Sequence, residues 1–272
     1  MQRVVLVAIV CLQISAIAWA ADEPEGKSAV VVHANAHAHN DYFHTRPLLD
    51  ALDQGFGSVE ADVFLADGEL LVAHSSFEVR RERTLEKLYL DPLAARCKAN
   101  GGLVYRDGPE LTLLVDLKTE AEATYAKLLE KLAKCESMLS KVVDGKVQRG
   151  AVMVVISGNR PVETMAKQST RLTFLDGRVN DLEANTPVDL APLVSDAWGN
   201  HFKWRGRGEM PKEELKKLNS MVAKAHEQHR RLRFWAAPDN AVTWEQLAAS
   251  GVDLINTDNL PELAEFLTAR AK

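Results

Sequence analysis

Short apolar runs alternate with longer amphipathic segments along most of this chain, and this alternation restricts the folds open to it. Several runs are almost unbroken, as in Leu111-Thr112-Leu113-Leu114-Val115. Such runs suit strands of a parallel sheet whose outer face is covered. We expect eight strands, at residues 29–34, 58–65, 111–118, 151–157, 172–176, 193–197, 232–236 and 252–257.

The segments between these runs carry a helical pattern. We expect helices at residues 45–54, 120–134, 212–228, 243–249 and 259–269, with Gly251 ending the fourth and Pro261 near the first turn of the last. Strands and helices that alternate over about 250 residues predict a (β/α)8 barrel, a TIM barrel. A doubly wound open sheet is the main alternative. The connection after the fifth strand, residues 178–189, is too short for a full helix and is expected to be irregular.

The first twenty residues differ from the rest. Arg3 precedes an apolar run, and Ala18-Trp19-Ala20 places small residues before a cleavage point. This pattern predicts a signal peptide at residues 1–20 and a mature domain at residues 21–272, exported to the periplasm or the extracellular space. An uncleaved membrane anchor is the alternative, although the residues after Ala20 carry no stop-transfer signal.

The state of the three cysteines depends on whether the protein is exported. Cys11 would leave with the signal peptide, whereas Cys97 and Cys135 would stay in the mature domain. In an exported protein, a disulfide between these two and a pair of isolated buried thiols are both open. Neither lies beside a histidine or in a C-x-x-C motif, so a catalytic thiol is not expected.

The charge balance limits the partners. Lysine and arginine number 33 and aspartate and glutamate 38, which gives a net charge of -5. There is no basic surplus to neutralise a phosphate backbone, so nucleic acid is not an expected partner. The pattern does not indicate an oligomeric state.

Carboxylates recur at the predicted ends of two strands. Glu60 and Asp62 are two residues apart and therefore share one face of a strand, and Asp116 and Lys118 do the same on the next strand. Three carboxylates that face one barrel mouth would repel one another unless a cation lies between them. Oxygen ligands alone favour one divalent Mg²⁺ or Ca²⁺ over Zn²⁺. The alternative is a structural salt-bridge network with Lys118 and an arginine.

Two histidines lie beside these acids in the predicted fold. His39 follows the first strand, and His74 follows the turn at residues 66–69. Cleavage of a phosphodiester requires removal of a proton from the attacking hydroxyl and donation of a proton to the leaving oxygen. Two imidazoles that titrate near neutrality can do both, while Lys118 holds the phosphate oxygens as a point charge.

These motifs carry a resemblance. The run His39, Glu60-x-Asp62, Asp67-Gly68 and His74, with Asp116-Leu117-Lys118 and residues 251–258, resembles the glycerophosphodiester phosphodiesterase and phosphatidylinositol-specific phospholipase C superfamily. The fuller pattern is similar to the altered-inheritance-of-mitochondria-type subgroup. It comprises His37-Ala38-His39-Asn40-Asp41-Tyr42, Ser58-Val59-Glu60-Ala61-Asp62-Val63, residues 84–93 and Arg233-Phe234-Trp235-Ala236.

The resemblance implies a TIM barrel with phosphoric diester hydrolase activity. It implies that His39 and His74 are the catalytic pair and that Glu60, Asp62 and Asp116 hold one divalent cation. The expected substrate is a small-molecule glycerophosphodiester or a phospholipid, which would place the enzyme in lipid metabolism. A lipid substrate would bring the protein into transient contact with a membrane surface.

The chain departs from the superfamily pattern at two positions. Asn40 stands where the family usually has arginine, so the phosphate clamp is either missing or supplied by Lys118, Arg160 or Arg178. Asn40 itself is expected to bind substrate together with these residues. Asp116 stands where glycerophosphodiesterases generally have glutamate. The Asp-x-Lys there is similar to the sphingomyelinase D branch, a phospholipase alternative that would form a cyclic phosphate. The inserted small domain of typical glycerophosphodiesterases is not expected here.

Weaker signals concern the walls of the pocket. Trp198, Trp204 and Trp235 could form an apolar wall for a substrate, although a position in the core is the more common outcome for such residues. Trp235, at the end of the seventh strand, is the best candidate for the pocket. The basic stretch at residues 226–233 is expected at a solvated helix end.

Two further interpretations of the function remain open. His37-Ala38-His39 is also typical of hydrolases that bind Zn²⁺ through nitrogen ligands, although the middle strands offer no further histidines. A non-catalytic barrel that binds a phosphorylated ligand is the other alternative.

Overall fold

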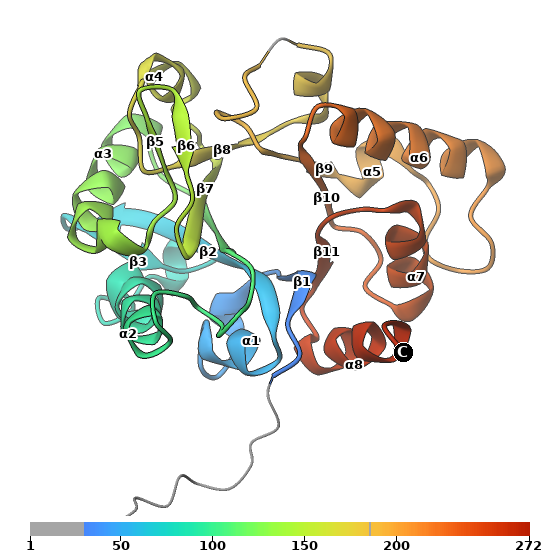
Figure 1. The fold of residues 1–272 in the computed structure, drawn as a ribbon, viewed down its shortest axis with the longest axis horizontal. Helices are drawn as coiled ribbons and strands as arrows, with labels where there is room; N and C mark the ends of the chain where they lie inside the picture. The colour runs from blue at the N-terminus through green and yellow to red at the C-terminus, as the bar shows by residue number, and fades with distance from the viewer. Residues whose placement is uncertain (1–29, 185) are drawn as a thin grey trace, which may run out of the picture.

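Eight parallel strands form a closed ring in the computed structural model, which describes residues 30–184 and 186–272 (Figure 1). The strands pair in the order β10-β9-β8-β7-β4-β2-β1-β11, and a parallel bridge between Arg233 and Leu254 joins the two ends. Closure confirms the predicted (β/α)8 barrel and excludes the open sheet. The ring consists of β1 (His33–Ala38), β2 (Phe56–Ala66), β4 (Leu111–Leu117), β7 (Val152–Gly158), β8 (Phe174–Gly177), β9 (Leu193–Ala197), β10 (Arg231–Trp235) and β11 (Ile255–Thr257).

Helices cover the outside of the ring, and the last helix lies beside β1, where the chain closes on itself (Figure 1). The α-helices are α1 (Leu49–Asp53), α2 (Asp91–Ala99), α3 (Ala121–Leu132), α4 (Val162–Lys167), α5 (Trp198–His201), α6 (Lys212–Glu227), α7 (Ala241–Ser250) and α8 (Leu260–Arg270). Shorter 3-10 or π turns occur at Asp41–Phe43, Ser76–Glu78, Glu86–Leu90, Ala133–Met138 and Val179–Leu182. None of the described helices has the length and apolar character that a membrane span requires.

Most predicted elements agree with the observed ones to within a few residues, but the first strand is displaced. It was expected at residues 29–34, whereas β1 is His33–Ala38. The apolar Val30 and Val31 that suggested the earlier start are exposed. The strand itself carries the polar His37 toward the barrel interior, which breaks the apolar run that marks most other strands.

Other differences concern elements that were not predicted. Three hairpin strands are among them: β3 (Glu69–Val72) pairs antiparallel with β2, and β5 (Lys141–Val143) pairs with β6 (Lys146–Gln148). The helices α2, α4 and α5 were not predicted either. The helix expected at residues 45–54 shortens to α1, which Leu48 precedes with a positive φ of 66°. The irregular connection after the fifth strand is confirmed, because residues 178–189 hold only the turn Val179–Leu182 among their described positions.

The two cysteines of the described chain are free thiols. Cys97 is buried in α2 among apolar side chains, and the Cys135 thiol lies 3.5 Å from the carbonyl oxygen of Leu132. The disulfide considered from the sequence is therefore not formed. Cys11, the predicted signal peptide and its cleavage point lie outside the described residues.

The barrel interior is divided into two levels. Along several strands an inward apolar residue is followed, two positions later on the same face, by a polar residue. The lower level, which we call the barrel floor, comprises the strand residues Leu114, Met153, Val155, Phe174, Leu193 and Leu254, which form one apolar cluster with Val142 of β5. The upper level, which we call the polar layer, consists of Glu60, Asp62, Asp116, Ser157, Asp176, Ser195 and Arg233. The strands are parallel, so the polar layer gathers at the carboxyl ends, where TIM barrels carry their active sites.

Candidate active site

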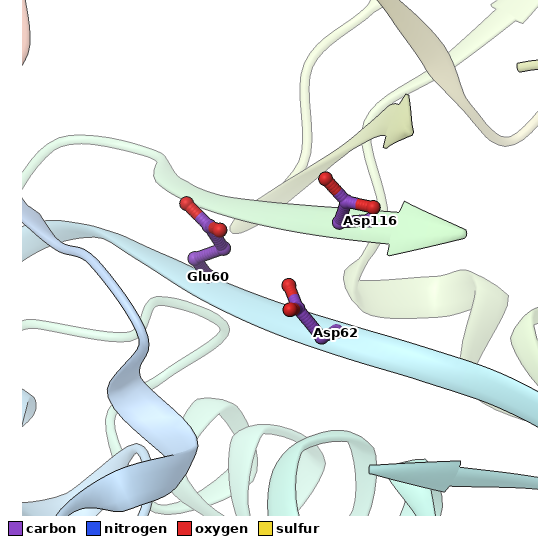
Figure 2. Close-up of side chains that lie close together, drawn as sticks. All are labelled: Glu60, Asp62 and Asp116. Carbon is purple, nitrogen blue, oxygen red and sulfur yellow. The ribbon is translucent and has the colours of Figure 1, made fainter. Parts of the chain in front are cut away.

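Three carboxylates of the polar layer converge (Figure 2). The register of β2 and β4 pairs Asp62 with Asp116 and Glu60 with Leu114 of the barrel floor, so all three acids face the interior as predicted. One carboxylate oxygen of each acid lies within 4.8 Å of the others. This spacing brings three negative charges to one side of the barrel mouth.

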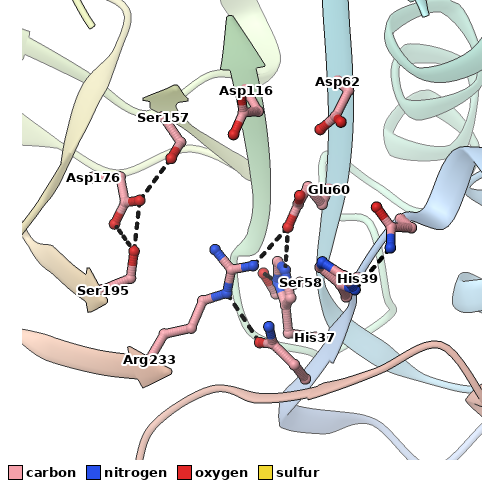
Figure 3. Close-up of polar contacts among 12 residues, drawn as sticks. His37, His39, Ser58, Glu60, Asp62, Asp116, Ser157, Asp176, Ser195 and Arg233 are labelled. Carbon is pink, nitrogen blue, oxygen red and sulfur yellow. Dashed lines mark hydrogen bonds and ion pairs between the residues drawn. The ribbon is translucent and has the colours of Figure 1, made fainter. Parts of the chain in front are cut away.

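A buried ion pair fixes the first of these acids (Figure 3). Glu60 Oε2 lies 2.6 Å from Arg233 Nη2 and 3.1 Å from His37 Nε2. Arg233 also donates to Asn256 Oδ1 over 2.9 Å. Burial alone would raise the pKa of Glu60, but the charge of Arg233 and the hydrogen bond from His37 together outweigh burial and hold that pKa well below its usual range. Glu60 is therefore a fixed anion.

The position of Arg233 differs from the one expected from the sequence. The basic stretch at residues 226–233 was placed at a solvated helix end, yet Arg230 and Arg233 are buried. The reason is that α6 ends at Glu227 and β10 begins at Arg231, so Arg233 is a strand residue that points into the polar layer.

His37 is the second hydrogen-bond partner of Glu60. Its side chain is fully buried, with Nδ1 2.7 Å from Ser58 Oγ and Nε2 facing Glu60. Burial, aided by the charge of Arg233, lowers the pKa of His37 to about 3, so the ring is neutral. Both ring nitrogens are occupied by protein partners. His37 therefore has no free nitrogen to serve as the first ligand of the zinc site considered from the His37-Ala38-His39 motif.

The other two acids are less well compensated. Burial, followed by the charge of Glu60, raises the pKa of Asp62 to about 6, and burial also raises the pKa of Asp116. The Lys118 ammonium lies 2.9 Å from Asp62 Oδ2 and 3.1 Å from Asp116 Oδ1. Asp62 Oδ1 is nevertheless buried without a hydrogen-bond partner. A buried polar atom without a partner is costly.

These observations fit a hard cation as the partner of the acids. Lys118 and Arg233 form the contacts that the salt-bridge alternative predicts, but two cationic side chains face three carboxylates and leave Asp62 Oδ1 unsatisfied. The donor set consists of carboxylate oxygens only, which suits Mg²⁺ or Ca²⁺. A glycine is needed at position 158, because the Cβ of any other residue there would overlap Asp116 Oδ1. Gly158 also has a φ of +67°, a conformation that other residues rarely adopt.

The two predicted histidines line the same cavity, whose volume is about 490 Å³. His39 follows β1, and its Nδ1 lies 2.9 Å from Asp258 Oδ1. Burial opposes the charged form of His39, but the hydrogen bond to Asp258 and the charge of Glu60 outweigh burial and raise the pKa of His39. The ring is thereby held toward the imidazolium form.

A tight hairpin brings His74 to the cavity. Asp67 and Gly68 both have positive φ in the two-residue turn between β2 and β3, which is the turn that antiparallel neighbours favour. The return strand pairs Val72 with Val63, and Ala73 N donates to Asp62 O. His74 Nδ1 consequently lies 3.4 Å from Asp62 Oδ2.

The predicted substrate-binding residues divide into two groups. Asn40, Lys118, Arg178 and Trp235 line the cavity, and Trp235 is 41% exposed. Arg160 is not among the residues that line it, and its guanidinium donates to the carbonyl oxygen of Asp176. Trp198 and Trp204 belong to the core, as expected.

Several polar residues of the site were missed at the sequence level. Asp176 accepts hydrogen bonds from Ser157 and Ser195 (Figure 3). It also pairs with Arg178 at 2.9 Å. Each of Asp176, Ser157 and Ser195 follows a floor residue by two positions, a signal that could have identified them. The partners of the two histidines, Tyr42 and Asp258, come from loops and have no such signal.

Comparisons with known proteins agree with this geometry. Residues 26–176 match the model of the AIM6-like phosphodiesterase domain. Altered inheritance of mitochondria protein 6 of Eremothecium gossypii is 30% identical over 87% of this chain and 70% of its own length. The same-named protein of Kluyveromyces lactis is 27% identical over 87% of this chain and 73% of its own length. These matches confirm the resemblance inferred from the motifs.

Solved structures confirm the fold. A glycerophosphodiester phosphodiesterase from Agrobacterium tumefaciens superposes with a TM-score of 0.50 and 15% identity, over 86% of this chain and 99% of that one. Another from Parabacteroides distasonis gives a TM-score of 0.53 and 14% identity, over 88% and 98%. At this identity the likeness concerns the barrel and not the substrate.

The buried ion pair allows a stability test. We predict that Arg233→Met lowers the free energy of unfolding by about 3–5 kcal/mol, because Glu60 is left as a buried charge without its cation. Urea denaturation at neutral pH measures the loss. The control is Arg270→Met, which removes an exposed pair with Glu245 and should cost at most about 1 kcal/mol. Similar small losses in both variants would contradict the role given to Arg233.

Proposed function

Because this chain belongs to the AIM6-like phosphodiesterase family, we propose that it cleaves a glycerophosphodiester or a phospholipid-type phosphodiester with one divalent cation and two histidines. The observation that carries the proposal is one cavity lined by Glu60, Asp62, Asp116, His39 and His74. No single member of this set would indicate the chemistry; their convergence does.

Glu60, Asp62 and Asp116 would hold the cation. When bound, a divalent cation neutralises charge on the non-bridging oxygens of the phosphate. Its identity is proposed as Mg²⁺ or Ca²⁺ from the oxygen donors alone. Glu60 enters such a site already ionised, because Arg233 stabilises its negative charge.

His39 is proposed as the general acid. Its Nδ1 faces the acceptor Asp258, so the ring proton on that side stays in place and the other nitrogen can give its proton to the leaving alcohol. The charges of Asp258 and Glu60 favour the protonated ring that this role needs.

His74 is proposed as the general base. It lies on the hairpin side of the cavity, next to Asp62, and more than half of its side chain is exposed to the cavity and solvent. It would take a proton either from water or from a neighbouring hydroxyl of the substrate. Water gives a phosphomonoester, whereas a substrate hydroxyl gives a cyclic phosphate, as in the sphingomyelinase D-like alternative.

Cationic side chains and one aromatic ring complete the proposed pocket. Lys118 and Arg178 bring positive charge to the cavity where the family pattern would place an arginine at position 40. Arg178 is held by buried Asp176, which limits its freedom to move. Trp235 offers an apolar face for the alcohol or lipid portion of the substrate.

The test is turnover of a panel containing a glycerophosphodiester, a lysophospholipid and sphingomyelin. We predict that His39→Ala and His74→Ala each lower kcat by about 100-fold or more and that a chelator abolishes activity until Mg²⁺ or Ca²⁺ is restored. His226→Ala is the matched control, since His226 also pairs with an aspartate but lies outside the cavity. Phosphorus NMR of the product separates the cyclic phosphate from the monoester.

One outcome of that panel would remove the catalytic assignment. If wild type and both histidine variants turn over every substrate equally, the two imidazoles take no part in the reaction.

We also propose that the protein is exported after cleavage between Ala20 and Ala21. The support is the sequence pattern alone. Expression in a secreting bacterial host should give a mature protein whose first residue is Ala21, as read by N-terminal sequencing of the exported fraction. A chain that keeps Met1 and stays with the membranes would instead support the uncleaved anchor.

A further inference from the structure

We propose that Tyr42 is a positioning residue that fixes the tautomer of His74, with the proton on Nδ1 and a free electron pair on Nε2. The inference rests on the proposed function, because it concerns the histidine assigned there as general base. Tyr42 itself does not need to touch the substrate.

The hydroxyl of Tyr42 is surrounded by three polar atoms. It lies 2.6 Å from Asn40 Oδ1, 2.7 Å from Asp62 Oδ2 and 2.9 Å from His74 Nδ1. The Tyr42 side chain is 2% exposed, so water cannot readily replace these contacts. Its backbone is also held, because Arg83 Nη2 donates to the Tyr42 carbonyl oxygen over 2.6 Å.

One neighbour of the hydroxyl has a fixed role. Asp62 Oδ2 accepts a hydrogen bond, because a carboxylate has no proton to donate. The Asn40 amide does not decide the arrangement, since its nitrogen lies 3.3 Å from the acceptor Asp258 Oδ1 and also 2.9 Å from His39 Nδ1.

Counting protons then selects one arrangement. A phenol hydroxyl has one proton to donate and lone pairs with which to accept. If it donated to His74, Asp62 Oδ2 would receive no proton, and a close contact between lone pairs would remain over 2.7 Å. If it donates to Asp62 Oδ2, it can accept the Nδ1 proton of His74. The second arrangement leaves fewer polar atoms unsatisfied and is favoured for that reason.

This tautomer gives His74 the form that a base requires. With Nδ1 protonated and bound to Tyr42, the Nε2 of the neutral ring carries the free electron pair. Within residues 30–184 and 186–272 no hydrogen bond to His74 Nε2 is formed, while the side chain lines the cavity. A proton taken from the attacking hydroxyl would go to this nitrogen.

The experiment is nitrogen-15 NMR of the protein with labelled histidines, with the His74 signals identified from the spectrum of His74→Ala. We expect the neutral ring of His74 to carry its proton on Nδ1 in the wild type. In Tyr42→Phe, which keeps the aromatic ring and removes only the hydroxyl, the Nδ1-protonated fraction should fall. Tyr105→Phe is the matched control, because Tyr105 is also buried and its hydroxyl donates to Phe56 O, outside the cavity.

Kinetics provide the second measurement. Tyr42→Phe should lower kcat about ten- to a hundred-fold with little change in KM, and Tyr105→Phe should leave both unchanged. The proposal is overturned if wild-type His74 carries its proton on Nε2, if Tyr42→Phe leaves the tautomer unchanged, or if kcat is unaffected when the tautomer changes.

The two proposals fail in different ways. The tautomer is measured without any turnover, so an unchanged tautomer refutes the role of Tyr42 even in an active enzyme. Full activity in His74→Ala would instead refute the proposed function, whatever the NMR spectrum of His74 shows.

Discussion

Three carboxylates confined to one barrel mouth are the constraint on which the rest of the site depends. Glu60, Asp62 and Asp116 come from two neighbouring strands, and strand register alone brings them together. The fold compensates the negative charges of the three acids unequally. Glu60 has a buried guanidinium from the far side of the ring, whereas Asp62 and Asp116 share one ammonium and keep raised pKa values. The remaining negative charge is what makes the mouth suited to a hard cation.

The same polar layer organises the histidines. His39 and His74 each turn Nδ1 toward a protein partner, Asp258 and Tyr42 respectively. Asn40 lies between the two partners and contacts both. Asn40 also has a φ of 48°, a left-handed conformation that asparagine tolerates better than most residues. The departure from the superfamily pattern at position 40 therefore has a structural role here.

The sequence predicts the barrel and the inward acids well, because strand periodicity determines which residues share a face. Glu60, Asp62 and Asp116 needed only the two-residue spacing and the assumption of adjacent strands. The partners Tyr42, Asp258 and Arg233 were not predicted, since their contacts depend on loop conformation and on closure between β10 and β11, which bring together residues as far apart as 60 and 233. Arg160 follows a strand end as expected but does not line the cavity, and strand periodicity could not predict that its guanidinium donates to the carbonyl oxygen of Asp176.

The central claim is that these three acids form one cation site beside the two imidazoles. Anomalous X-ray diffraction from crystals soaked in Mn²⁺, a hard cation that prefers oxygen ligands, tests it most directly. The account predicts a single strong anomalous peak in contact with Glu60, Asp62 and Asp116, and the loss of that peak in Asp62→Asn. Crystals that show no peak among the three acids, with the Lys118 ammonium still between Asp62 and Asp116, would contradict it.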